Sequence, residues 1–378
     1  MSSESEQKLR HEVEQTSQTA GVTLGDIPIL LIVALALRTL LQYQLVLGAS
    51  LSFNRPPLGW NLALLAATAP LGIIIHEFGH WVAGTVLQQY CRRIVIGPLE
   101  LARSGGRWAF RLVPIRHAGL VDFVPSTFNH FRLKRALCVA SGPAASLLGG
   151  LAFTALALQA NTSAEFWIAS DCTQWSLIGF LGLMPFRRGD LRSDGSLLWD
   201  LIRGGRAADE TERDLLVASS YATPLCMREW PRDLIERLRS TANAPRYDTY
   251  LAYVFYLDSR EHAHARNCLA RLTSDWRADD PAEYALEAAY FHALFDDDLA
   301  AAQMWLSREE SSYEPWVHLR AEAAVAWVGG DHDAAQTKAQ QARDLLERAI
   351  PCGAYRYELD RLDDLMERSP ANLDRSGI

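Results

Sequence analysis

The sequence predicts a mainly α-helical, polytopic membrane domain with a small membrane-associated β-sheet, followed by a cytosolic α-helical domain. Three observations support this fold class. The first half of the chain has four apolar segments of nearly membrane-spanning length, the stretch between the second and third alternates apolar and polar residues, and the second half has helical periodicity without such segments. We therefore expect a flexible cytosolic tail at residues 1–26, a membrane-embedded domain at 27–205 and a cytosolic helical domain at 206–378.

The composition of the 378-residue chain excludes several classes of function. Its net charge is −8 and no basic stripe with interleaved aromatic residues is present, which argues against a nucleic-acid partner. The six cysteines are scattered singly, so they form neither a disulfide framework nor a thiolate zinc site. The first 26 residues lack the basic-then-apolar order of a signal peptide, and we interpret them as a cytosolic tail.

The four apolar segments lie at residues 27–53, 58–87, 136–160 and 166–186. Each approaches the roughly 20 residues that a helix needs to cross a bilayer. Asp171 interrupts the fourth segment, which is therefore the weakest of the four.

Basic residues predict how these segments are oriented. Nine arginines and lysines lie between the second and third segments, whereas none lies in the loop 161–173. Arg187, Arg188 and Arg192 follow the fourth segment directly. Because basic loops stay on the cytosolic side, we expect a multi-pass protein of the cell inner or plasma membrane with both termini in the cytosol.

An H-E-x-x-H motif at residues 76–80 ends the uncharged part of the second segment, 58–75. On a helix His76 and His80 project from one face, so both imidazoles can reach one zinc ion. Glu77 lies about 100° around the helix, where it can take a proton from a water at the metal. Since ionisable groups within an apolar segment are costly, they usually mark function. The motif predicts a catalytic zinc site.

Two histidines leave a catalytic zinc ion one protein ligand short. The cytosolic end of the fourth segment offers two carboxylates after Pro185, namely Asp190 and Asp194. We favour Asp194, because Gly195 after it would let the backbone turn while the carboxylate points at the metal. Asp190 stays open as the alternative ligand. In that case Asp194 belongs to an ordinary turn.

At this point the chain resembles the site-2 protease family of intramembrane zinc metalloproteases, whose members pair H-E-x-x-H with an Asp-Gly on a later helix. The resemblance implies that His76, His80 and Asp194 hold one zinc ion per chain and that Glu77 is the catalytic base.

Other motifs extend this resemblance over about residues 58–205. Residues 141–146 look like the Gly-Pro-x-x-Asn of the family, and 94–98, 108–114 and 119–121 look like its membrane-associated strands.

The chain departs from the family pattern at three places. Gly182 replaces the Asn of an Asn-x-x-Pro motif, and Ser146 replaces the Asn of Gly-Pro-x-x-Asn. Pro185 precedes Asp194 by nine residues, and the shorter spacing of many members fits Asp190 better. The missing Asn side chains concern substrate handling more than metal binding.

The alternating stretch 92–124 predicts a β-hairpin around residues 104–106. Two interpretations stay open: a structural cap over the cytosolic face, or an edge that holds an unwound substrate segment by strand addition.

The polar second half repeats itself at residues 260–263, 297–301 and 330–335, each time between two helical stretches. This pattern resembles degenerate tetratricopeptide repeats, with a non-repetitive helical bundle as the alternative. A protein partner of this domain is expected if the repeat interpretation holds.

Two functions remain. The first is a zinc metallo-endopeptidase that hydrolyses peptide bonds in or near transmembrane segments, with membrane-protein substrates in a lipid bilayer. The second is a catalytically inactive, site-2-protease-like scaffold that binds membrane clients. Glu77 favours the enzyme, because a scaffold has no need of a base, whereas Gly182 and Ser146 favour the scaffold slightly.

Overall fold

The computed structural model describes residues 27–54, 56–104, 106–115, 118–188, 191–240, 244–277, 280–309, 312 and 314–367. The tail predicted at 1–26 and Asp190 lie outside the described residues. The chain divides into two compact units, one comprising Met1–Val124 and Asn129–Ala208, the other Pro125–Phe128 and Asp209–Ile378. The described residues are mostly helical, and the first unit adds a small antiparallel sheet of four strands.

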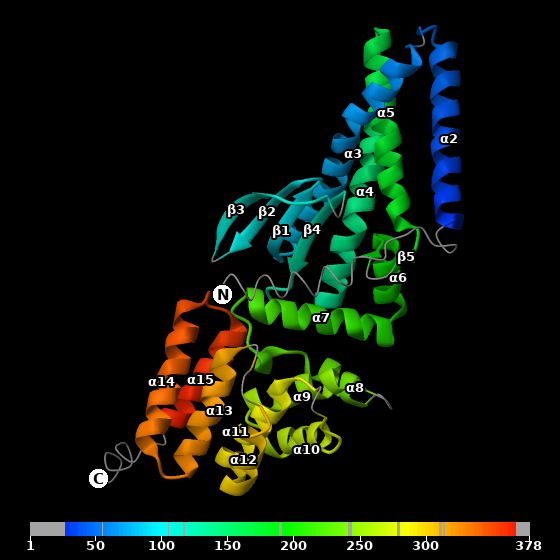
Figure 1. Cartoon of the computed structure of the whole chain (residues 1–378). Coiled ribbons are helices and arrows are strands. Elements are labelled where there is room, and N and C mark those ends of the chain that lie inside the picture. Colours follow the sequence, from blue (N-terminus) through cyan, green and yellow to red (C-terminus); the bar gives the residue numbers. More distant parts are fainter. Residues whose placement is uncertain are drawn as a thin grey trace. The chain divides into compact units, whose positions relative to one another are not determined.

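Four long helices form the body of the first unit (Figure 1). They are α2 (Ile27–Ser50), α3 (Leu58–Val86), α4 (Phe131–Leu158) and α5 (Ser163–Phe180). The helices α3, α4 and α5 pack on one another, and α2 packs on α5. Each of the four apolar segments therefore contributes one helix to the unit.

All four helices differ from the predicted segments at one or both ends, α4 and α5 by the most residues. The helix α4 begins five residues before 136, because its first turn is basic and hydropathy detects only the apolar part that follows. The helix α5 ends at Phe180 instead of 186, and a short 3-10 helix, η2 (Leu181–Leu183), follows before Pro185. Proline disfavours helical backbone at the residue before it, and Met184 is accordingly extended, so the helical backbone stops after η2.

The helices α3 and α4 are long and apolar enough to cross a membrane. Only 11% of the most apolar window of α3 and 33% of that of α4 is buried within the protein. A core helix of a soluble protein would be mostly buried, so these exposed apolar surfaces favour contact with lipid. Among the described residues these two helices meet the criterion for a span, and the four-span topology stays a prediction.

Small residues let the helices of the first unit approach closely. A Cβ atom on Gly79 of α3 would overlap the Ser141 carbonyl of α4, and one on Gly72 would lie 2.6 Å from Trp175 Cβ of α5. Close approach of this kind is typical of helix packing in membranes. It brings the H-E-x-x-H turn of α3 directly against α4.

The sheet has the strand order β3-β2-β1-β4 and is antiparallel throughout. Its strands are β1 (Tyr90–Ile96), β2 (Leu99–Ser104), β3 (Arg107–Leu112) and β4 (Gly119–Val124), so the predicted strands are confirmed. The strands β1 and β4 contact α3, which places the edge strand β4 beside the helix that carries the motif (Figure 1). After α4, α5 and η2 the chain continues through β5 (Arg187–Arg188), β6 (Leu191–Arg192) and α6 (Asp194–Arg203).

The second unit is built from short helices. These are α7 (Arg206–Ala222, which begins in the first unit), η3 (Met227–Glu229), α8 (Arg232–Ser240), α9 (Arg246–Asp258), α10 (His262–Thr273), α11 (Ala282–Asp296), α12 (Leu299–Leu306), α13 (Pro315–Val328), α14 (His332–Arg348) and α15 (Gly353–Glu367). Three consecutive pairs, α9 with α10, α11 with α12 and α13 with α14, pack as helix hairpins.

The repeated sequence pattern of this unit falls in the turns of the three hairpins. Arg260, Asp297 and Gly330 adopt left-handed backbone, with φ of 60°, 53° and 82°. Asp298 and Asp331 then cap the next helix, each accepting the backbone N–H three residues later, at 2.9 and 3.0 Å. Such turn chemistry ends and starts helices in any helical hairpin. The tetratricopeptide interpretation therefore stays a prediction.

A buried ionic cluster lies at the centre of the second unit. Glu287 of α11 accepts hydrogen bonds from Arg320 of α13 at 2.8 Å and from Arg361 of α15 at 2.7 Å. Both guanidinium groups also lie over the Tyr290 ring, at 4.4 and 4.1 Å. Burial alone would raise the pKa of Glu287, but the two cations outweigh it and lower the pKa to about 2. The cluster links three helices through one carboxylate.

Candidate active site

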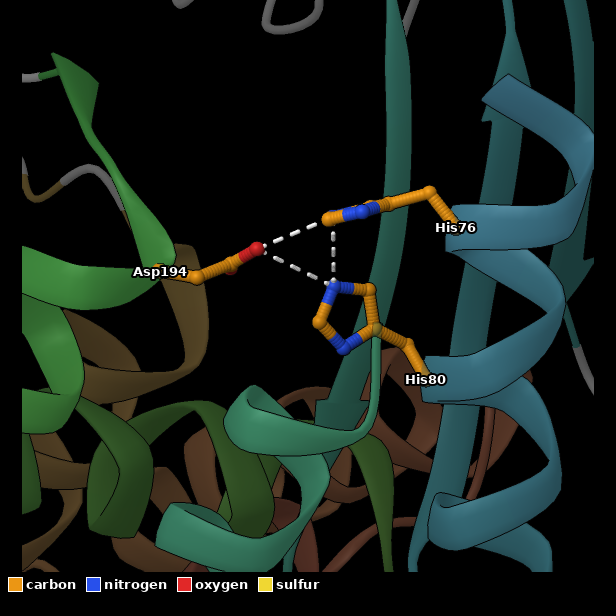
Figure 2. A group of neighbouring side chains, drawn as sticks. All are labelled: His76, His80 and Asp194. Carbon is orange, nitrogen blue, oxygen red and sulfur yellow. Dashed lines mark hydrogen bonds and ion pairs between the residues drawn. The ribbon is translucent and has the colours of Figure 1, made fainter. Parts of the chain in front are cut away.

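The two histidines of the motif face one another across one turn of α3 (Figure 2). Their Nε2 atoms lie 3.2 Å apart. His80 Nδ1 lies 2.7 Å from the Cys138 carbonyl oxygen, and His76 Nδ1 lies 3.0 Å from Ser146 Oγ. A carbonyl oxygen can only accept, so His80 carries its proton on Nδ1 and keeps the lone pair of Nε2 free for a metal.

Asp194 completes the cluster from the first residue of α6. Its Oδ2 atom lies 2.9 Å from His76 Nε2 and 3.4 Å from His80 Nε2 (Figure 2). Burial alone would raise the pKa of this carboxyl group, but the contacts with the two imidazoles outweigh it and lower the pKa to about 2. Asp194 is therefore an anion at neutral pH, as a metal ligand has to be.

The reason expected for the Asp-Gly pair is wrong. Gly195 does not adopt left-handed backbone, so it makes no sharp turn. Instead, a Cβ atom at Gly195 would overlap the Leu183 carbonyl of η2. Ser193 caps α6 by accepting the Ser196 N–H at 3.1 Å. The glycine thus lets α6 start directly against η2, and this close approach carries Asp194 to the histidines.

The arrangement of these donor atoms fits one zinc ion. The three ligand atoms all lie within 4.8 Å of one another. Tetrahedral zinc with bonds of about 2.0–2.1 Å to nitrogen and oxygen separates its ligand atoms by roughly 3.3 Å. The observed separations of 2.9, 3.2 and 3.4 Å are close to that value. Two imidazoles and one carboxylate are also a donor set of catalytic zinc sites.

Glu77 lies next to this cluster and lines, with it, a cavity of about 480 Å³. Only 8% of its surface is exposed. A Cβ atom on Gly119 at the start of β4 would overlap the Glu77 carboxylate, so the edge strand and the carboxylate are in direct contact. The cavity thus brings together a carboxylate, three side chains whose donor atoms could hold a metal ion, and the edge of a strand.

Several residues that build the site carry no signal in the sequence. A Cβ atom on Gly142 of α4 would overlap the His80 ring, so this glycine makes the space in which His80 stands. The Cys138 carbonyl orients His80, and no sequence pattern marks a backbone carbonyl. Ser146, which the sequence shows as a departure, orients His76 instead. Only the resemblance over residues 141–146 pointed to this part of α4.

A comparison with known protein families agrees with this interpretation of the site. The family described as Peptidase family M50 matches residues 65–349, which is more than half of the chain. The chain belongs to peptidase family M50. This is the site-2 protease family, whose members are in general zinc-dependent metallopeptidases of membranes. The searches of curated proteins and of solved structures gave no match.

In this chain Gly182 and Ser146 stand where the family pattern has Asn. Gly182 leaves space beside the metal site, because a Cβ atom there would lie 3.6 Å from both Asp194 Oδ2 and His76 Cε1. Ser146 is buried and occupied by its contact with His76. In this M50 member the two positions therefore offer no amide to a substrate.

Proposed function

We propose that this M50 member is an intramembrane zinc metallo-endopeptidase that hydrolyses peptide bonds in or near transmembrane segments of membrane proteins. The observation that carries the proposal is the convergence of His76, His80 and Asp194, with Glu77 beside them. The exposed apolar surface of α3, which holds three of these residues, supports a site at membrane depth.

The proposed mechanism assigns a task to each residue. His76, His80 and Asp194 hold one zinc ion per chain, which when bound supplies Lewis-acid polarisation of the scissile carbonyl and makes a water more acidic. Glu77 takes a proton from the attacking water and returns it to the leaving amine. Contacts with Ser146 and with the Cys138 carbonyl fix the orientation of the two imidazoles.

The edge strand β4 supports strand addition over a simple structural cap. Among the described residues β4 pairs with no strand other than β1, so its other edge carries no strand. Gly119, Leu120 and Val121 of this strand line the cavity that contains Glu77. We propose that an unwound substrate segment pairs with this edge, which would expose a peptide bond that a helix shields.

We propose a multi-pass protein with both termini in the cytosol, supported by the distribution of arginines and lysines.

We further propose that the helices from residue 206 onward recruit substrates or another protein. The hairpins α9–α10, α11–α12 and α13–α14 support this because stacked helix pairs offer extended binding surfaces.

The test compares wild type with Glu77→Gln in cells, by proteomics of membrane-protein fragments. Glu77→Gln keeps all three zinc-binding side chains but has no proton acceptor, so we expect unchanged zinc content and loss of the fragments. Glu347→Gln, which changes an exposed carboxylate on α14, serves as control and should retain them.

The same experiment decides for or against the scaffold. An inactive scaffold would yield the same fragments in wild type and Glu77→Gln, while both forms co-purify with the same membrane proteins. The replacements at Gly182 and Ser146 are the observations that favour this second function.

A further inference from the structure

The cavity beside the metal-binding cluster carries opposite charges on its walls. Glu77 and Asp194 supply two carboxylates. Three guanidinium groups face the same cavity from three different elements: Arg93 from β1, Arg135 from α4 and Arg192 from β6. Hydrolysis by zinc and Glu77 does not require these three arginines, so they have no role in the mechanism proposed above.

Two of these arginines already have carboxylate partners. Arg93 Nε lies 3.4 Å from Asp122 Oδ2, and Arg192 Nη1 lies 3.8 Å from Asp200 Oδ2. These ion pairs hold the two guanidinium groups at the cavity wall and neutralise part of their charge.

Arg135 differs from the other two. Its Nη1 atom donates to the Phe123 carbonyl oxygen at 3.3 Å, and its Nε atom is buried without a hydrogen-bond partner among the described residues. No carboxylate within the described part of the chain forms an ion pair with it. Asp122 and Asp194 attract this partly buried cation from beyond ion-pair distance. A carboxylate that enters the cavity would accept the hydrogen bonds that its guanidinium group does not make within the described part of the chain.

The position of Arg135 places that anion close to the reacting bond. Arg135 lies one helical turn before Cys138, whose carbonyl orients His80. Phe123, to which Arg135 donates, belongs to β4, the strand whose first residue touches Glu77. The guanidinium group is thus fixed between the helix that supports a metal-binding residue and the strand beside the base.

We propose that Arg135, flanked by Arg93 and Arg192, binds an acidic side chain of the substrate within a few residues of the scissile bond. This inference rests on the proposed peptidase function and names the class of substrate. The planar guanidinium fork matches a carboxylate, which explains arginine at this place better than lysine would. A group that stabilises the reaction itself would act on every substrate equally, whereas a recognition group acts only on acidic ones.

The experiment uses the purified full-length protein in detergent micelles. The probes are single-span transmembrane peptides that differ only in having Glu, Gln or Lys at the positions around the cleaved bond, with products identified by mass spectrometry. For wild type we expect the ratio of kcat/KM for Glu over Gln peptides to be at least tenfold. Arg135→Gln should reduce this ratio about tenfold, and Arg135→Lys should restore part of it.

Arg132→Gln is the matched control, because Arg132 lies on the same helix but does not line the cavity. This variant should keep the wild-type ratio. Equal cleavage of Glu and Gln peptides by wild type would overturn the proposal, as would an equal loss on all peptides in a folded Arg135→Gln.

A binding measurement separates this proposal from the peptidase function. Glu77→Gln protein should bind the Glu peptides at least fivefold more tightly than the Gln peptides, and the double variant with Arg135→Gln should lose the difference. Equal binding overturns acidic recognition, whether or not the wild type cleaves. Cleavage that depends on Glu77 but shows no acidic preference would leave the peptidase standing and remove only the present inference.

Discussion

In the proposed zinc site, Asp194 is the residue on which metal binding depends most, because it is the one anionic donor in the cluster of three. It reaches His76 and His80 from a different helix, so it also fixes α6 against α3 once a metal is bound. Loss of this carboxylate removes both a ligand and a charge that offsets the cation.

We therefore predict that Asp194→Ala lowers zinc affinity by at least about 100-fold and abolishes hydrolysis, since even loss of a ligand's supporting partner costs 10–100-fold. Zinc content of the purified variants, measured by mass spectrometry, provides the check. Asp190→Ala is the comparison and should retain zinc and activity. The reverse pattern would make Asp190 the third ligand.

Gly142 leads to a second prediction at this scale. Gly142→Ala would place a methyl group on the His80 ring, so the imidazole has to move and zinc affinity should fall about 10–100-fold. Alanine favours a helix more than glycine does, so the substitution should not weaken α4 itself. Competition with a chelator measures the affinity.

Gly182→Ala is the control for this prediction, because a Cβ atom there has ordinary contact distances of 3.6 Å. If both variants bind zinc like wild type, close packing of α4 on His80 does not shape the site.

Two carboxyl groups of the second unit, Glu287 and Glu314, have pKa values shifted in opposite directions. Glu287 is balanced by two arginines and stays ionised. Glu314, which precedes α13, is different: burial, with a smaller contribution from the nearby Glu358, raises its pKa to about 7 against its hydrogen bond with Tyr221, which lowers it. This carboxyl group is thus protonated in the folded unit at pH values where it would ionise in an unfolded chain.

The sign of the pH effect follows from that difference. Between the ordinary pKa of Glu and about 7, the folded state binds the extra proton, so stability falls as pH rises through this window. We predict that the second unit loses about 1 kcal/mol between pH 6 and pH 8. Hydrogen exchange of α13 in the full-length protein is the measurement.

Glu314→Gln cannot ionise and should not show this loss. Glu347→Gln, an exposed carboxylate on α14, should behave as wild type. A wild type whose α13 exchanges equally at both pH values, after correction for intrinsic exchange, would contradict the raised pKa.

For the molecule as a whole, topology is the property that most needs a direct test. The native cysteines are poor reporters, because Cys91 and Cys172 are both buried. Exposed positions are available instead: Asn161 lies in the loop between α4 and α5, and Ser307 follows α12.

We predict that Asn161→Cys reacts with a membrane-impermeant maleimide from outside intact cells, whereas Ser307→Cys reacts only after the cells are opened. The reason is the positive charge that flanks the other ends of these helices and is absent from the loop 161–173. Labelling of Ser307→Cys from outside would reverse the orientation.

The sequence by itself determined the features that depend on local periodicity. A spacing of four residues puts His76 and His80 on one face of any helix, and alternation over 92–124 predicts strands whatever they pack against. The turns at 297–301 and 330–335 were visible for the same reason, because capping chemistry lies within a few residues of chain.

Only the tertiary structure decided which distant groups meet. The space that Gly142 makes for His80 and the place of Arg135 on the cavity wall depend on segments more than 50 residues apart in the chain. Gly195 shows this limit most clearly. The sequence marked this residue, but glycine is needed here for close packing against Leu183 and not for a turn. Packing between elements has no local period, so the sequence could predict which residues bind a metal but could not show what holds them in position.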